Sequence, residues 1–189
     1  IYDKVEDKII KSYPIKTDLA FQVLDAIDLE ETFVNVVHEG QVYSEKRFFQ
    51  TFKEENLFKR SAIESMEATR IALDSVYDKL KEFDEIEKLH LNYRDTETRD
   101  KMLARIEEHE DYMILQSSAR NIEITHVDTD KGRAALALCD LLGMEDVKVM
   151  AFGDNINDIP LFKVADVKVK MKNGLSALDD YTNAVTDFT

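Results

Sequence analysis

The first two thirds of the chain alternate between strand-like and helix-like patterns of hydrophobic residues. Residues 8–15 and 33–37 are strand-like, and between them apolar residues at helical spacing follow Thr17, which we expect to cap a helix. A turn at Gly40 leads to a further short strand, which completes a β-α-β-β unit. The aromatic cluster within residues 48–70 fits either helix or packed loop.

Further along, residues 75–83 place apolar side chains on one helical face. Residues 89–93 alternate between apolar and polar side chains, which predicts a strand with one polar side. Asp95 or the next threonine is expected to cap a helix, and two more strands are predicted at 113–115 and 122–124. Residues 1–126 are therefore expected to form one mainly antiparallel α+β domain.

After residue 127 the pattern changes to strict alternation of strand and helix. Asp130 is expected to cap a helix that ends in a left-handed turn at Gly143. Alternation of this kind implies a parallel sheet, so the predicted fold class is α/β with a domain boundary near residue 127. Three short strands are too few for a complete doubly wound sheet, and the chain begins with Ile1, so a fragment is expected. The predicted inward-facing residues of the first helix are Ala134, Leu138, Leu141 and Leu142, and the later predicted elements are strand 147–152, a helix from 159, strand 167–170, helix 175–181 and strand 184–188.

The stretch 147–162, VKVMAFGDNINDIPLF, carries most of the candidate chemistry. Its nearly continuous apolar start predicts a strand covered on both faces, and Gly153 permits a sharp turn out of it. Asn157 or Asp158 can cap the following helix, which tolerates Pro160 in its first turn.

Asp154 and Asp158 are thereby expected at the carboxyl end of a parallel strand, where open α/β sheets bind ligands. Two carboxylates near a helix N-terminus suit Mg²⁺ together with a phosphate group. Aspartate and asparagine are also common in any strand-to-helix turn, so an ordinary turn is the competing interpretation.

Lys131 lies in the first turn of the helix that Asp130 is expected to cap. A lysine there is electrostatically unfavourable, because that end of a helix already carries partial positive charge. A residue that opposes the local preference indicates another role, although exposed lysines are usually only solvated.

The motif GDNINDIPLF resembles the fourth motif, GDxxND, of the haloacid dehalogenase-like superfamily, which transfers phosphoryl groups through an aspartyl-phosphate. Residues 163–167 and 169–173 are similar to the strand and loop that follow it there. Residues 122–124 and then Asp130-Lys131-Gly132 resemble the cap-exit strand and third-motif lysine of the Cof-type phosphatases, which carry a large α+β cap. The resemblance is specific only over residues 122–173.

The resemblance implies a Mg²⁺-dependent phosphatase for small phosphorylated metabolites such as sugar phosphates. It makes Asp154 a Mg²⁺ ligand, Asp158 a direct ligand or an indirect acidic partner, and Asn157 a hydrogen-bond donor to phosphate or substrate. Lys131 would bind the transferring phosphate. The catalytic residues of this chain would then be Lys131, Asp154 and Asp158, in a partial Rossmann-type core at 127–189 beneath a cap at 1–126.

The family's nucleophile motif, DxDGT, is not found in this sequence. Asp128-Thr129-Asp130 resembles it slightly, but only one helix separates that triplet from the fourth motif, which leaves no room for the intervening strands. Helix capping is a sufficient explanation for Asp130. The nucleophile and the general acid are therefore expected in a segment before Ile1, and these 189 residues alone are expected to be inactive.

The composition and charge of the chain argue against several other kinds of partner and site. The net charge of −14 and the pI of about 4.7 argue against nucleic acid or anionic membrane as partners. No apolar run is long enough for a membrane span, and the single Cys139, expected to be a small buried hydrophobe, fits the cytoplasm. The four histidines lack zinc-site spacing. The sequence does not indicate an oligomeric state.

Two alternative functions remain. The hinge motif GDGxNDxP of P-type ion pumps is close to GDNINDIP, but such a pump needs membrane helices and a DKTGT motif. A relative without a nucleophile could instead be a non-enzymatic module that binds a metabolite.

Overall fold

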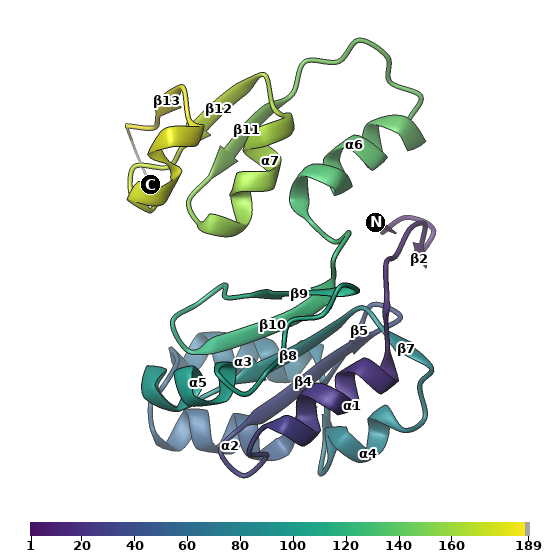
Figure 1. Cartoon of the computed structure of the whole chain (residues 1–189), viewed down its shortest axis with the longest axis vertical. Helices are drawn as coiled ribbons and strands as arrows, with labels where there is room; N and C mark the ends of the chain where they lie inside the picture. Colours follow the sequence, from purple (N-terminus) through teal and green to yellow (C-terminus); the bar gives the residue numbers. More distant parts are fainter. Residues whose placement is uncertain (188–189) are drawn as a thin grey trace. The chain divides into compact units, whose positions relative to one another are not determined.

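The computed structural model describes residues 1–187 and divides into two compact units. The N-terminal unit is Tyr2–Val127, and the C-terminal unit is Asp128–Thr189 together with Ile1 (Figure 1). The predicted strand 184–188 extends to residue 188, which lies outside the described residues.

The N-terminal unit is built on a six-stranded sheet with the order β6-β5-β4-β8-β10-β9. All neighbouring strands are antiparallel except β5 and β6, which run parallel. Two short pairs, β1 with β2 and β3 with β7, accompany this sheet. The elements are β1 (Tyr2–Asp3), β2 (Lys8–Ile9), β3 (Ile15–Lys16), α1 (Thr17–Ala26), β4 (Phe33–His38), β5 (Gln41–Glu45), α2 (Lys46–Glu54), α3 (Arg60–Thr69), β6 (Ile71–Leu73), α4 (Val76–Leu80), β7 (Glu85–Ile86), β8 (Lys88–Asn92), α5 (Thr96–Leu103), β9 (Tyr112–Leu115) and β10 (Asn121–His126).

Successive residues of each strand face opposite sides of this sheet, and each side has its own core. Val34 and Leu91 belong to the larger core, which α1, α4 and α5 complete. Phe33 belongs to a second, aromatic core with Phe48 and Phe52 of α2. The fully buried large side chains of the unit come from both cores. Residues 48–70, open between helix and packed loop in the sequence, form two helices that supply this aromatic core.

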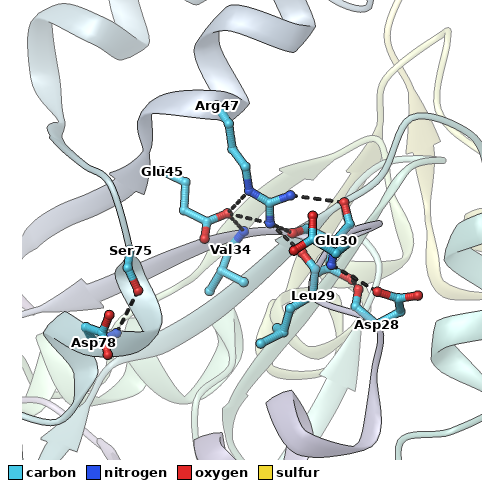
Figure 2. A network of polar contacts seen from close by, with 9 residues as sticks. Asp28, Leu29, Glu30, Val34, Glu45, Arg47, Ser75 and Asp78 are labelled. Carbon is cyan, nitrogen blue, oxygen red and sulfur yellow. Dashed lines mark hydrogen bonds and ion pairs between the residues drawn. The ribbon is translucent and has the colours of Figure 1, made fainter.

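A polar network ties the loop before β4 to the start of α2 (Figure 2). The Arg47 guanidinium donates to a Glu45 oxygen at 3.0 Å and to the backbone oxygens of Leu29, at 2.5 Å, Glu30, at 3.0 Å, and Thr32. Glu45 is 7% exposed and also accepts from the backbone N–H of Val34 at 3.1 Å. Burial raises the pKa of Glu45, and Arg47 opposes that rise. This network fixes a loop that has few apolar residues of its own.

Local details differ from the sequence predictions at two places. Residues 8–15 form no continuous strand, because only Lys8–Ile9 and Ile15–Lys16 pair with other strands. Thr17 is the first residue of α1 rather than its cap, and its hydroxyl donates to the Phe83 oxygen at 2.7 Å. Asp95 caps α5 as predicted, accepting from the backbone N–H of Thr98 at 2.7 Å.

The C-terminal unit contains a three-stranded parallel sheet with the order β11-β12-β13, which confirms the predicted parallel pairing. Asp130 caps its first helix by accepting from the Arg133 N–H, and Gly143 has the predicted left-handed backbone with φ of 62°. Residues 176–181 form a 3₁₀ helix rather than an α-helix. The elements are α6 (Lys131–Leu141), β11 (Met150–Gly153), the 3₁₀ helix η1 (Ile156–Asp158), α7 (Ile159–Val164), β12 (Val167–Lys170), the 3₁₀ helix η2 (Ser176–Tyr181) and β13 (Ala184–Val185).

The apolar residues of this unit are less covered than the sequence predicts. Its fully buried hydrophobic cluster consists of Ala151, Phe162, Ala165 and Leu178. The strand expected at 147–152 begins only at Met150, and both Met150 and Phe152 are more than half exposed, so the prediction of cover on both faces is wrong. The predicted inward residues of α6 are also exposed, because the unit offers too little apolar surface to cover them; they are Ala134, Leu138, Leu141 and Leu142. Cys139 is half-buried.

Candidate active site

The loop that follows β11 is folded around the carboxylate of Asp158. Its Oδ2 accepts hydrogen bonds from the backbone N–H groups of Asp154, at 2.9 Å, and Asn155, at 3.1 Å. The Asn155 side chain in turn caps η1 by accepting from the backbone N–H of Ile156 at 2.7 Å. These reciprocal bonds satisfy backbone groups that a helix start leaves without partners. Asp158, one of the two predicted caps, is at the N-cap position of α7 but makes no side-chain capping hydrogen bond there, and it stabilises the loop from inside instead.

This arrangement requires glycine at position 153, because there is no space for a side chain there. A Cβ atom at position 153 would lie 2.6 Å from Cβ of Asp158 and 2.8 Å from Cζ of Phe162. Only glycine lets the loop close this tightly around the aspartate.

Lys131 donates a hydrogen bond to the other Asp158 oxygen, Oδ1, so the structure brings these two predicted residues together. The Lys131 side chain is 50% exposed, whereas the Asp158 side chain is 4% exposed. The contact depends on close packing of α6 against α7, because a Cβ on Gly132 would lie only 2.3 Å from the backbone oxygen of Pro160. Lys131 therefore has a fixed inner partner while its other side remains open to solvent.

The charge state of Asp158 follows from these contacts. Burial alone would raise the pKa of Asp158, but hydrogen bonds from Lys131 and from the N–H groups of Asn155 and Asp154 together lower it. The carboxylate is ionised at neutral pH, and it holds the ammonium group of Lys131 by charge as well as by hydrogen bonding.

Asp154 differs from Asp158 in being exposed. Its backbone is fixed, because its carbonyl accepts from the Leu175 N–H at 3.0 Å and the Gly153 carbonyl accepts from the Met171 N–H at 2.9 Å. Within residues 1–187, no hydrogen bond or ion pair engages the Asp154 carboxylate. Asp154 thus offers two free anionic oxygens from a rigid backbone.

This donor set can be tested for its fit to Mg²⁺. Magnesium is commonly bound by one or two carboxylates, with water and substrate phosphate completing the octahedron. Asp154 fits that description, whereas both oxygens of Asp158 already accept hydrogen bonds. No cluster of three or more histidine, cysteine or carboxylate side chains suited to a metal occurs in the described part of the chain. Asp154 therefore fits a Mg²⁺ ion that is also bound by ligands from outside the described residues.

Asn157 follows Ile156 in the same loop but joins neither Lys131 nor Asp154 through a hydrogen bond among the described residues. Its side-chain Oδ1 is buried and lacks a partner there. Its predicted donor role remains a prediction.

Two residues important for this geometry were missed from the sequence. Gly132 was noticed only as part of a motif, although its contact with Pro160 is what allows Lys131 to reach Asp158. Asn155 was passed over as a cap in favour of later residues. The spacing Asn155-x-x-Asp158 is close to that of a capping box and could have identified it.

The family model of haloacid dehalogenase-like hydrolases matches residues 1–189, the whole of the chain. The chain is 29% identical over 100 residues to the 5-amino-6-(5-phospho-D-ribitylamino)uracil phosphatase YcsE of Bacillus subtilis (strain 168). That match covers 53% of this chain and 40% of the relative. A phosphoglycolate phosphatase 2 of Saccharolobus solfataricus is 33% identical over 46% of this chain and 35% of its own length.

Solved structures show the same fold. A haloacid dehalogenase-like hydrolase from B. subtilis aligns with a TM-score of 0.77 and 21% identity over 98% of this chain and 70% of its own. The subclass IIB sugar phosphatase BT4131 aligns with a TM-score of 0.66 and 14% identity, over 93% and 62% of the two chains. The predicted α/β fold class is confirmed by these likenesses. The chain belongs to the haloacid dehalogenase-like hydrolase family.

Proposed function

We propose that this chain is the cap and the C-terminal part of the core of a Mg²⁺-dependent phosphatase. The cap would be residues 1–126 and the core part residues 127–189. The protein would hydrolyse small phosphorylated metabolites through an aspartyl-phosphate whose nucleophile lies outside this sequence. The observation that carries the proposal is the grouping of Lys131 with Asp158 on the loop that also presents Asp154.

Each of these side chains would have a separate role. The Lys131 ammonium, held from behind by Asp158, would bind a phosphoryl oxygen and stabilise the charge that develops during transfer. Asp154 would hold Mg²⁺, which when bound neutralises charge on the phosphoryl oxygens. Asp158 would position Lys131 and the backbone of the loop rather than contact the metal directly. Asn157 would donate a hydrogen bond to phosphate or substrate.

The substrate class is inferred from the family and from the names of relatives. The relatives include enzymes named for a phosphorylated ribityl compound and for phosphoglycolate, both small phosphate monoesters. The net charge of −14 argues against a nucleic-acid partner, because the chain has no surplus of basic residues to neutralise phosphates. No helix in residues 1–187 has the length and apolarity to cross a bilayer. The lone Cys139 supports a cytoplasmic location.

The proposal is tested with the longer protein obtained by including the residues that flank this chain in its gene. We expect Mg²⁺-dependent hydrolysis of phosphate monoesters, reduced by roughly a hundredfold or more in Lys131→Ala and Asp154→Asn. Asp166→Asn is the matched control, because Asp166 is an exposed aspartate whose partners, Lys148 and the backbone N–H of Val149, lie outside the loop 153–158. Equal rates in all four proteins would contradict the roles proposed here.

The 189-residue chain itself is predicted not to turn over p-nitrophenyl phosphate. Steady turnover by the purified chain would refute the proposal that the nucleophile lies outside this sequence. Metabolite binding by the longer protein without any hydrolysis would instead favour the non-enzymatic alternative.

A further inference from the structure

The loop that follows β12 lies beside the loop that presents Asp154. Strands β11 and β12 run parallel, and their register pairs Gly153 with Lys170, so both strands leave the sheet at the same edge (Figure 1). The next residues are Asp154 after β11 and Met171 after β12. We call residues 171–175 the β12 loop. The sheet topology thus brings the β12 loop next to Asp154.

Hydrogen bonds from the β12 loop hold the two backbone carbonyls around the Asp154 Cα. The Met171 N–H donates to the Gly153 carbonyl at 2.9 Å, and the Leu175 N–H donates to the Asp154 carbonyl at 3.0 Å. The Asp158 carboxylate accepts from the N–H groups of the same two peptide units on their opposite side. Because peptide units are planar, both of those next to the Asp154 Cα are fixed at each end, which leaves only side-chain rotation free.

Gly174 allows the β12 loop to approach Asp154 closely. A Cβ atom at position 174 would lie 2.9 Å from the Met171 carbonyl oxygen, 2.9 Å from Cγ of Lys170 and 3.2 Å from the Asp154 Cα. All three separations are shorter than the roughly 3.5 Å at which favourable non-bonded contact begins. A larger residue at position 174 would therefore push the loop away from Asp154.

The β12 loop is anchored on the side that faces away from Asp154. The Lys172 N–H donates to the Thr186 hydroxyl at 3.0 Å, and the Thr186 N–H donates to the Lys170 carbonyl at 2.9 Å. The largely buried side chain of Lys170 forms an ion pair with Asp179 of η2. The loop is thus tied to the end of the sheet and can hold the Asp154 backbone in one position.

We propose that the β12 loop is a positioning element for the divalent metal, because the Leu175 N–H and the close approach at Gly174 set the direction of the Asp154 carboxylate. The inference rests on the proposed function, in which Asp154 holds Mg²⁺. Gly174 has no side chain and that of Leu175 is apolar, so both residues act through Asp154 and not on the metal. Removal of groups that orient a metal ligand typically weakens metal binding by roughly tenfold to a hundredfold.

Leu175→Pro removes one hydrogen bond from this arrangement. Leu175 has φ of −60°, close to the angle that proline adopts, and it is 46% exposed. Proline lacks the N–H that donates to the Asp154 carbonyl, whereas Leu175→Ala keeps that N–H and shortens the side chain. The two variants therefore separate the hydrogen bond from the leucine side chain.

The experiment is a Mn²⁺ titration of the longer protein that includes the flanking residues, with free Mn²⁺ measured by electron paramagnetic resonance. We expect Leu175→Pro and Gly174→Ala each to raise the Mn²⁺ dissociation constant by roughly tenfold. Leu175→Ala should bind Mn²⁺ as the unaltered protein does. Equal weakening in Leu175→Ala and Leu175→Pro would refute the hydrogen bond as the cause.

Amide hydrogen exchange shows whether a variant acts through the β12 loop or by unfolding the C-terminal unit. The N–H groups of Asp154 and Asn155, which donate to Asp158, should stay protected in Leu175→Pro and Gly174→Ala. Protection of the Leu175 N–H should fall in Gly174→Ala, because the loop no longer reaches the Asp154 carbonyl. Loss of protection at all three amides would assign the weaker binding to unfolding and refute the positioning role.

Asp154→Asn separates this inference from the proposed function. If Asp154→Asn abolishes Mn²⁺ binding while Leu175→Pro and Gly174→Ala bind as tightly as the unaltered protein, the positioning role is refuted and the metal assignment stands. If Asp154→Asn leaves Mn²⁺ binding unchanged, the proposed role of Asp154 fails and this inference fails with it.

Discussion

The two units of this protein bury their apolar residues to very different extents. The N-terminal unit has a six-stranded sheet with a hydrophobic core on each face. The C-terminal unit has three short strands and, among its described residues, a cluster of four buried hydrophobic residues, while Leu138, Met150 and Phe152 are about half exposed. The proposed catalytic residues all lie in this sparsely packed unit. Their geometry must therefore come from local contacts rather than from a large core.

Those local contacts are of two kinds. Glycine allows backbones to approach closely, at Gly132 against Pro160 and at Gly153 against Asp158. Buried hydrogen bonds to the Asp158 carboxylate then fix the loop and Lys131. A site built in this way can keep its shape in a unit that has little apolar packing.

The largest expected difference between the units is in their response to leucine truncation. Leu91→Ala should destabilise the N-terminal unit by about 3 kcal/mol, because Leu91 is fully buried and its loss leaves a cavity. Leu138→Ala, at a position 45% exposed in α6, should change the C-terminal unit by less than about 0.5 kcal/mol. Amide hydrogen exchange measures each unit separately. Equal losses would show that α6 is buried in solution.

Removal of Arg47 tests the polar network of the N-terminal unit. Arg47→Ala leaves the buried Glu45 and three backbone carbonyls without their donor, and we expect a loss of about 2 kcal/mol in unfolding free energy. Lys46→Ala is the control, because its ion pair with Asp74 is exposed and should contribute little. Urea denaturation compares the two. A similar small effect in both variants would show that the network is not stabilising.

Gly132→Ala tests the close contact that positions Lys131. Alanine favours a helix by about 1 kcal/mol over glycine, but its Cβ would collide with the Pro160 carbonyl. We expect a net loss of about 1–2 kcal/mol in the C-terminal unit, with NMR shifts at the loop 153–158. Ala134→Ser, two residues later and exposed, should leave both unchanged. A more stable Gly132→Ala variant would mean that α6 and α7 are not in tight contact.

A further expected difference is a pH dependence caused by His90, which faces Asn121, Glu123, Lys88 and Arg70. Its pKa is about 4 in the folded unit and about 6.5 when unfolded, so the unfolded chain binds the proton first. Stability should be complete above pH 6.5 and fall as the pH drops toward 4, by about 2 kcal/mol at pH 5. Urea denaturation at pH 7 and pH 5 measures this, and His90→Gln should flatten the difference. If the unfolding free energy of His90→Gln still depends on pH as in the unaltered chain, a group other than His90 causes the dependence.

The sequence predicted the order of elements well where hydrophobic period and caps agree. Strands β4, β8 and β10 and the caps Asp95 and Asp130 follow from local patterns, and the structure confirms them. Periodicity cannot show whether a partner surface exists. For that reason the α6 leucines and both faces of β11 are predicted to be covered, although the leucines are exposed and β11 is buried on one face only, at Ala151 and Gly153.

The sequence identifies the residues of the candidate site better than it predicts their arrangement. The motif around residues 153–158 and Lys131 identified a group that the structure brings together in part, at Lys131 and Asp158. The division of labour between an exposed Asp154 and an enclosed Asp158 depends on backbone hydrogen bonds that residue types do not reveal. The alternation of residues 89–93 predicted a polar side for β8, but strand pairing was needed to align His90 with Asn35 and Glu123.

The most direct test of the central claim is a Mn²⁺ titration of the longer protein that includes the flanking residues, with Mn²⁺ standing in for Mg²⁺, followed by paramagnetic broadening of amide signals. We predict selective broadening of residues 153–158 and of Lys131, which Asp154→Asn abolishes and Asp166→Asn leaves intact. Broadening that is spread over the acidic surface, or that persists unchanged in Asp154→Asn, would contradict a divalent-metal site at this loop.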